Sequence, residues 1–133
     1  MSEGNVELVR TGLGSWNGGD LDAMSDTWDE HIVMRSDESW PEAVYYGKEA
    51  VRSFFAGFAE TVGGEAVIED LIDAGDSVVV RIRTHYSGEQ SGVEGNLVSS
   101  QVVTFRKGKV ILIEFFLDHQ QALEAAGLSE DPS

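Results

Sequence analysis

Apolar and polar residues alternate along the stretch 99–117, SSQVVTFRKGKVILIEFFL, with the period of two that is typical of β-strands. Near its middle, Gly108 can adopt the positive φ that a tight hairpin turn needs. The pattern predicts two long antiparallel strands whose shared inner face carries Ser99, Gln101, Val103, Phe105, Ile111, Ile113, Phe115 and Leu117. The opposite face is also partly apolar, so we expect another surface to cover it.

Three stretches in the first half of the chain place apolar residues three and four apart, as on one side of an amphipathic helix. These helices are predicted at 5–16, after Asp20 with Met24 and Trp28 on the buried side, and at 48–62. Their apolar stripes have to be buried together, so the helices are expected on one face of a sheet.

Two glycines interrupt the first predicted helix. Gly12 and Gly14 each weaken a helix interior by about 1 kcal/mol relative to alanine. Either packing holds this helix, or the glycines make room for something that lies close to it.

The remaining elements are predicted as strands at 31–36, 66–72 and 78–86, a loop at 37–47, and a short closing helix that begins after Asp118. Consecutive strands with short turns between them pair antiparallel. The expected fold class is therefore α+β, with three N-terminal helices on a strongly curved, mostly antiparallel sheet that encloses a cone-shaped interior. One domain is expected at 1–128, and residues 129–133 are expected to fray.

Six segments in chain order carry a family resemblance: Trp16–Ala23, the strand near His31, Tyr46–Val51, Asp73–Asp76, Phe105–Val110 and Ala122–Leu128. Together they resemble SnoaL-like proteins of the nuclear transport factor 2-like superfamily, over nearly the whole chain. The resemblance implies a cone-shaped α+β barrel with a deep pocket, often dimeric through the back of the sheet. That superfamily includes ketosteroid isomerases, polyketide cyclases, epoxide hydrolases, dehydratases and members without catalysis, so the fold alone does not decide the function.

The catalytic positions that the resemblance implies hold residues without acid or base chemistry. In the register of ketosteroid isomerases, the carboxylate base falls at Ser36, the protonated acid at Gln101 and the tyrosine near Gly12. In the register of polyketide cyclases, the aspartate falls at Phe115 and the histidine at Gln101. None of these side chains shuttles a proton at neutral pH, so the sequence leaves open whether the protein is an enzyme.

Three residues, Asp118, Asp37 and His85, are weak candidates for a displaced acid or base. A β-bulge that shifted a strand by one residue would bring Asp37, or Glu114, into the pocket. Asp118 precedes His119, but its place before a helix favours a capping role. His85 could titrate near neutral pH, although the alternation puts it on the back of the sheet.

Gln101 is the strongest candidate for a ligand contact, because an amide among apolar side chains needs partners for its donor and its acceptor. It either orients a ligand carbonyl or hydroxyl, or it bonds to Ser99, Ser36 or a buried water. The predicted ligand-binding residues are Gln101, Ser36, Trp16, Met34, Trp40, Tyr45, Phe54, Phe58, Val103, Ile113 and Phe115. If the pocket were closed, the same residues would fill a core.

Composition narrows the class of partner. The 133-residue chain has 24 acidic and 9 basic side chains and a formal net charge of −15, which would repel nucleic acid and anionic membranes. It has no cysteine, its histidines lack the spacing of a metal site, and no cofactor motif is present. No signal peptide or membrane span is recognisable, so we expect a cytoplasmic protein.

Three functions are open at this stage. The first is a SnoaL-like pocket protein, dimeric through the back of its sheet, that binds a small and mostly apolar molecule. The second is a proton-transfer enzyme of the isomerase, polyketide cyclase or dehydratase type, with a non-standard acid or base. The third is a non-catalytic dimeric scaffold with a filled cone.

Overall fold

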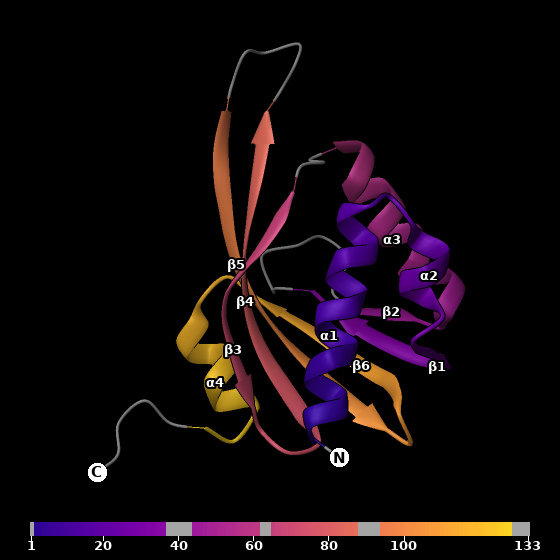
Figure 1. Cartoon of the computed structure of the whole chain (residues 1–133), viewed down its shortest axis with the longest axis vertical. Helices are drawn as coiled ribbons and strands as arrows, with labels where there is room; N and C mark the ends of the chain where they lie inside the picture. Colours follow the sequence, from indigo (N-terminus) through magenta and orange to yellow (C-terminus); the bar gives the residue numbers. More distant parts are fainter. Residues whose placement is uncertain (1, 37–43, 62–64, 88–93, 129–133) are drawn as a thin grey trace.

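A single curved sheet lies at the centre of the computed structural model, which describes residues 2–36, 44–61, 65–87 and 94–128. Within these residues the helices are α1 (Ser2–Asn17), α2 (Leu21–Ser25), α3 (Lys48–Thr61) and α4 (His119–Ala125). The strands are β1 (Trp28–Arg35), β2 (Val44–Tyr46), β3 (Ala66–Asp73), β4 (Ser77–Ser87), β5 (Glu94–Arg106) and β6 (Lys109–Phe116). Figure 1 shows α1, α2 and α3 on one side of the sheet and α4 on the other.

The strands pair in the order β2-β1-β6-β5-β4-β3, and every pair is antiparallel except β1 with β6. This arrangement confirms the predicted α+β class with a curved, mostly antiparallel sheet. The sheet itself is not closed, because β2 and β3 are its two edges. The helices, rather than further strand pairing, complete the cone.

The start of β1 differs from the prediction. Trp28 was expected on the second helix, but α2 ends at Ser25 after a single capped turn, in which Asp20 accepts a hydrogen bond from the Ala23 amide at 3.0 Å. Trp28 instead pairs with Val110 of β6. The Trp28 ring still lies in the core, at 4% exposure. At the start of β1 it faces inward, as it would have done on the predicted helix.

The strand β2 was wrongly predicted as loop. Its three residues are too few to show a period of two, although β-branched and aromatic side chains favour strands. Tyr46 pairs with Val33 and Val44 with Arg35. The Gly47 amide then donates to the carbonyl of Ile32 at 2.8 Å and leads into α3.

The central hairpin contains a β-bulge that the alternation did not predict. Its turn has positive φ at Lys107 (54°) and Gly108 (77°), as a tight hairpin requires. Phe105 pairs with Val110 but Thr104 pairs with Leu112, so Ile111 is the extra residue. The expected inner positions of Ile111 and Leu117 are therefore wrong. Val110 takes the place of Ile111, and Leu117 lies beyond β6 at 57% exposure.

The main core lies between α1, α2 and α3 and the inner face of the sheet. Ile32 and Met34 of β1 and Val51 of α3 have no exposed surface at all. At the edge of the sheet, the Asn17 side chain at the end of α1 donates to the Ala66 carbonyl at 2.9 Å and accepts from the Ala66 amide at 2.8 Å. This pair of bonds ties the last turn of α1 to β3.

A second cluster explains part of the apolar back of the sheet. Ala122 and Leu123 of α4 pack there against Val79 and Val102. The His119 ring also bonds the buried Ser100 hydroxyl through Nδ1 at 2.7 Å. The chain's own last helix thus covers a surface for which the sequence suggested a neighbouring subunit.

Candidate functional site

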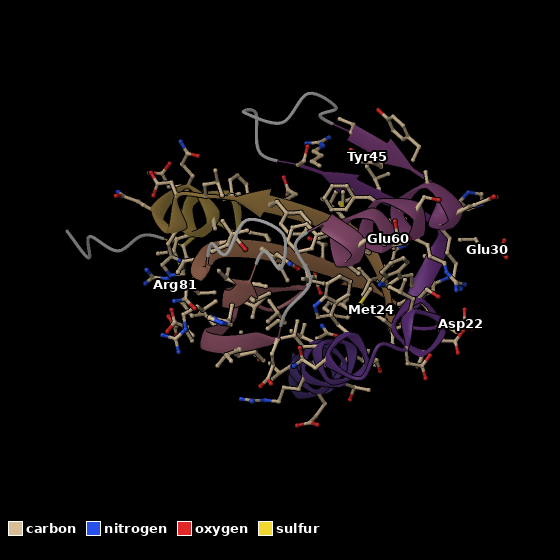
Figure 2. All side chains as sticks on the ribbon, turned by 90° about the horizontal axis from the view of Figure 1, so that it is seen from above. Asp22, Met24, Glu30, Tyr45, Glu60 and Arg81 are labelled. Atoms are coloured by element: carbon tan, nitrogen blue, oxygen red, sulfur yellow. The ribbon has the colours of Figure 1, made fainter. Side chains whose placement is uncertain are left out.

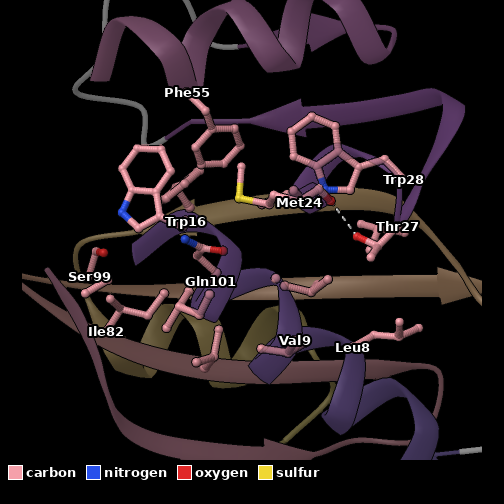
Figure 3. Close-up of a pocket in the computed structure, with 18 of the residues that line it drawn as sticks. Leu8, Val9, Trp16, Met24, Thr27, Trp28, Phe55, Ile82, Ser99 and Gln101 are labelled. Carbon is pink, nitrogen blue, oxygen red and sulfur yellow. Dashed lines mark hydrogen bonds between the residues drawn. The ribbon is translucent and has the colours of Figure 1, made fainter. Parts of the chain in front are cut away.

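A cavity opens between the three N-terminal helices and the inner face of the sheet (Figure 3). About 100 Å³ of it is open to the centres of water molecules. One water needs about 10–15 Å³ on this measure, so the space suits several waters or one small ring. The cavity has two unlike walls.

Aromatic rings form the wall on the helix side. Trp16 of α1 lies edge-on to Phe55 of α3, with ring centroids 5.8 Å apart. Phe54 lies 5.5 Å from Phe55 and 6.0 Å from Phe115 of β6. Trp28 continues the cluster at 5.6 Å from Phe55. Rings at these separations attract one another and present flat apolar surface to a ligand.

Polar side chains are concentrated on the sheet side. Gln101 and Ser99 of β5 lie opposite Val80 and Ile82 of β4, and Thr84 follows on the same face. In the part of the chain that the structure describes, the side chains of Gln101, Ser99 and Thr84 make no hydrogen bond to the protein. Figure 3 shows the Gln101 amide directed from the sheet toward Trp16 and Met24.

Among the described residues that line the cavity, none carries a titratable side chain. Figure 2 shows Asp22, Glu30 and Arg81 on the outside of the molecule and Met24 in its interior. The lining can therefore offer apolar contact and neutral hydrogen bonds. Among these described residues there is no charge to pair with an ionised ligand and no side chain that can remove a proton from one.

The predicted ligand-binding residues fall into three groups. Those that line the cavity are Trp16, Phe54, Phe58, Gln101, Val103, Ile113 and Phe115. Met34 is fully buried in the core, Tyr45 packs beside Phe54 at 5.1 Å between ring centroids, and Ser36 is not part of the lining. Trp40 lies outside the described residues.

The candidate acids and bases that the structure describes do not line the cavity. Asp118 caps α4 by accepting from the Gln120 amide at 2.9 Å. His85 is exposed and pairs with Asn96 on the back of the sheet. Asp37 lies outside the described residues. Glu114 pairs with Val102 on the back, so the bulge in this hairpin does not bring it inside.

Sequence reasoning missed several lining residues. Thr84 could have been found, because it shares the parity of Val80 and Ile82 along β4. Thr27 could not, because it follows α2 and donates to the Met24 carbonyl at 2.8 Å, a position without periodicity. Gly12 was noted for its weak helix propensity, and it lines the cavity.

Comparison with known proteins was informative at the level of family and fold. A family model described as a SnoaL-like domain matches residues 9–113. No curated protein matches the chain significantly. In the described residues, no helix is long and apolar enough to cross a membrane.

Several solved structures have the same fold. Bal32a, from a soil-derived mobile gene cassette, is 25% identical with a TM-score of 0.76, over 86% of this chain and 89% of that one. A protein from Jannaschia sp. CCS1, described as a SnoaL-like polyketide cyclase, is 24% identical with a TM-score of 0.78, over 98% and 95%. TerC, co-crystallised with polyporic acid, is 19% identical with a TM-score of 0.76, over 93% and 98%.

Proposed function

The chain belongs to the SnoaL-like domain family, and from this premise we propose that the protein binds one small, uncharged and mostly apolar molecule in its cavity. The observation that carries the proposal is the Gln101 amide, which faces a mostly apolar cavity and has no hydrogen-bond partner in the described residues. A ligand carbonyl or hydroxyl would supply that partner.

The energetics of an amide favour a ligand that carries a hydrogen-bonding group. In the described residues no buried side-chain polar atom lacks a partner, so the Gln101 amide is open to water in the cavity. A ligand that displaces this water without replacing its hydrogen bonds loses about 1–3 kcal/mol. Ser99 and Thr84, on the same wall, add hydroxyls that can donate or accept.

The absence of a titratable group in the described lining weighs against the proton-transfer alternative. An isomerase or a cyclase needs a base within about 3 Å of the proton it removes. Phe115 and Gln101 stand at the implied acid and base positions and cannot fill this role. Binding without proton transfer is therefore the function that the geometry supports best. TerC, which has the same fold, was crystallised with an organic molecule.

We also propose that two copies associate through the part of the back that α4 leaves uncovered. Tyr46 lies there at 74% exposure and pairs with Val33 of β1. Val33 in turn pairs with Leu112 of β6. Arg35 and Glu114 are neighbours on the same face. A two-fold axis would bring Arg35 of one copy toward Glu114 of the other, and such self-complementary charge suits an isologous contact.

The test compares benzamide, which has a ring and an amide, with toluene, which has only the ring. The indole N–H signals of Trp16 and Trp28, which line the cavity, report both ligands in an NMR titration. Gln101→Leu should lower the affinity for benzamide by about 1–3 kcal/mol, roughly 5–150-fold, because the amide contact is lost. The affinity for toluene should stay the same or rise.

Gln121→Leu is the matched control, because Gln121 is exposed on α4, on the opposite side of the sheet. It should bind both ligands like the unaltered protein. If Gln101→Leu keeps its affinity for benzamide, Gln101 is not a recognition contact. If the unaltered protein binds neither ligand, the proposed function is wrong and the scaffold alternative gains support.

A further inference from the structure

Gly12 is a buried residue in the middle of α1 whose missing side chain leaves space in the cavity. It is one of the residues that line the cavity. A Cβ atom placed on Gly12 would meet a single neighbour within 4 Å, the Cγ of Met24 at 3.9 Å, which is an ordinary van der Waals contact. Packing within the described protein therefore does not require glycine at this position.

The helix would be more stable with alanine there. Glycine loses more backbone freedom on folding than any other residue, and alanine is the best helix former. Gly12 has no positive φ that would demand glycine. An alanine here would stabilise the helix, and in the described residues its methyl would contact Met24 at an ordinary distance and make the cavity smaller.

We propose that Gly12 and Met24 form the part of the cavity wall that limits ligand size, and that the apolar edge of a ring packs against it. The surface here is suited to such an edge. The helix backbone around Gly12 is hydrogen-bonded within α1 and offers only Cα hydrogens, and the Met24 thioether makes favourable contacts with aromatic rings. This inference rests on the proposed function and adds where the apolar part of the ligand lies.

Gly14 provides the matched control. It lies two residues further along the same helix, it is exposed, and a Cβ placed on it would meet nothing within 4 Å. Gly12→Ala and Gly14→Ala therefore make the same chemical change in the same helix. They differ in that only the first adds a methyl to the cavity.

Both variants of the full chain should melt a few degrees higher than the unaltered protein, because each removes a helical glycine. Only Gly12→Ala should lose affinity for benzamide. The loss should be about tenfold or more, because one methyl group in a hydrophobic pocket changes affinity by that much. Its loss should be larger for 4-methylbenzamide, which is longer. A protein that becomes more stable while its ligand affinity falls is not expected from a purely structural glycine.

Three results overturn the inference. If Gly12→Ala binds benzamide as tightly as Gly14→Ala does, the space at Gly12 is not used, while the proposed function stands on the binding by the unaltered protein. If Gly12→Ala melts lower or does not fold while Gly14→Ala melts higher, packing needs the glycine. If the unaltered protein binds neither benzamide nor toluene, the proposed function fails and this inference with it.

A second variant tests the same part of the cavity wall at Met24. Met24→Ala removes the side chain that faces Gly12. The ratio of the affinities for 4-methylbenzamide and benzamide is measured within this one variant, so a lower stability of the variant affects both affinities alike. The preference for 4-methylbenzamide over benzamide should rise at least several-fold. An unchanged preference would place the size limit elsewhere in the cavity.

Discussion

Replacing Asn17 with alanine should destabilise the protein and weaken its ligand binding at the same time. The Asn17 amide makes two short hydrogen bonds to the backbone of Ala66, at 2.8 and 2.9 Å. Each bond contributes about 0.5–1.5 kcal/mol net. Because Asn17 is itself exposed, water can replace part of the loss, and we expect about 1–2 kcal/mol in total. For a chain of this length, that corresponds to a melting temperature lower by about 4–7 °C.

The effect on binding follows from the position of Asn17 directly after Trp16. The two bonds hold the last turn of α1 against β3, and Trp16 in that turn forms part of the aromatic wall. Without them the ring loses its fixed place beside Phe55. We expect the affinity for toluene, which makes only apolar contacts, to fall several-fold.

The assay is urea unfolding followed by circular dichroism, together with the NMR titration with toluene. Asn96→Ala is the matched control, because Asn96 is exposed on β5 and its side chain makes no hydrogen bond in the described residues. It should change the free energy of unfolding by less than about 0.5 kcal/mol. If Asn17→Ala is as stable as Asn96→Ala, the two bonds to Ala66 do not hold the helix end, and the reasoning is refuted.

Two further predictions concern charge and association. The described lining of the cavity contains no titratable side chain, so the affinity for toluene should be constant between about pH 5 and 8. An inflection of the affinity in this range would reveal an ionising group at the site. Tyr46→Glu should shift the protein from dimer to monomer in sedimentation experiments. Val67→Glu should not, because Val67, at 42% exposure, lies on β3 at the other edge of the sheet. Equal sedimentation of both variants and the unaltered protein would contradict the proposed contact through β1 and β2.

The sequence was a good guide wherever many side chains repeat one period. The strands β4, β5 and β6 and the helices α1 and α3 are long enough for their apolar faces to be recognised. It was a poor guide for β2, which has three residues, and for the boundary between α2 and β1 at Trp28. Such short elements are fixed by hydrogen bonds to distant strands, and these have no signature in local sequence.

The candidate site shows the same division. Gln101 and Phe115 were predicted on the inner face from alternation alone, and both line the cavity. Alternation says which residues share a face, but not how far along a strand the cavity extends. Met34 and Ser36 share the face of Ile32, yet Met34 is in the packed core and Ser36 is not part of the lining. Met34 and Val51 of α3 belong to the same buried cluster, and alternation along β1 does not predict where α3 packs on it.

The bulge at Ile111 decides the chemistry of the cavity. Starting from the pair Phe105 and Val110, regular antiparallel pairing would put Glu114 opposite Gln101, so a carboxylate would face the cavity. The one extra residue shifts the strand, and Phe115 pairs with Gln101 instead, while Glu114 turns to the back. The same β6 sequence would thus place a carboxylate in the cavity in one register and a phenyl ring in the other. In the sequence, a bulge was one way in which Glu114 could have been brought into the pocket, but the bulge at Ile111 leaves Glu114 on the back. In the described lining, the uncharged character of the cavity therefore follows from the pairing of the hairpin, and this supports the proposal that the protein binds a ligand.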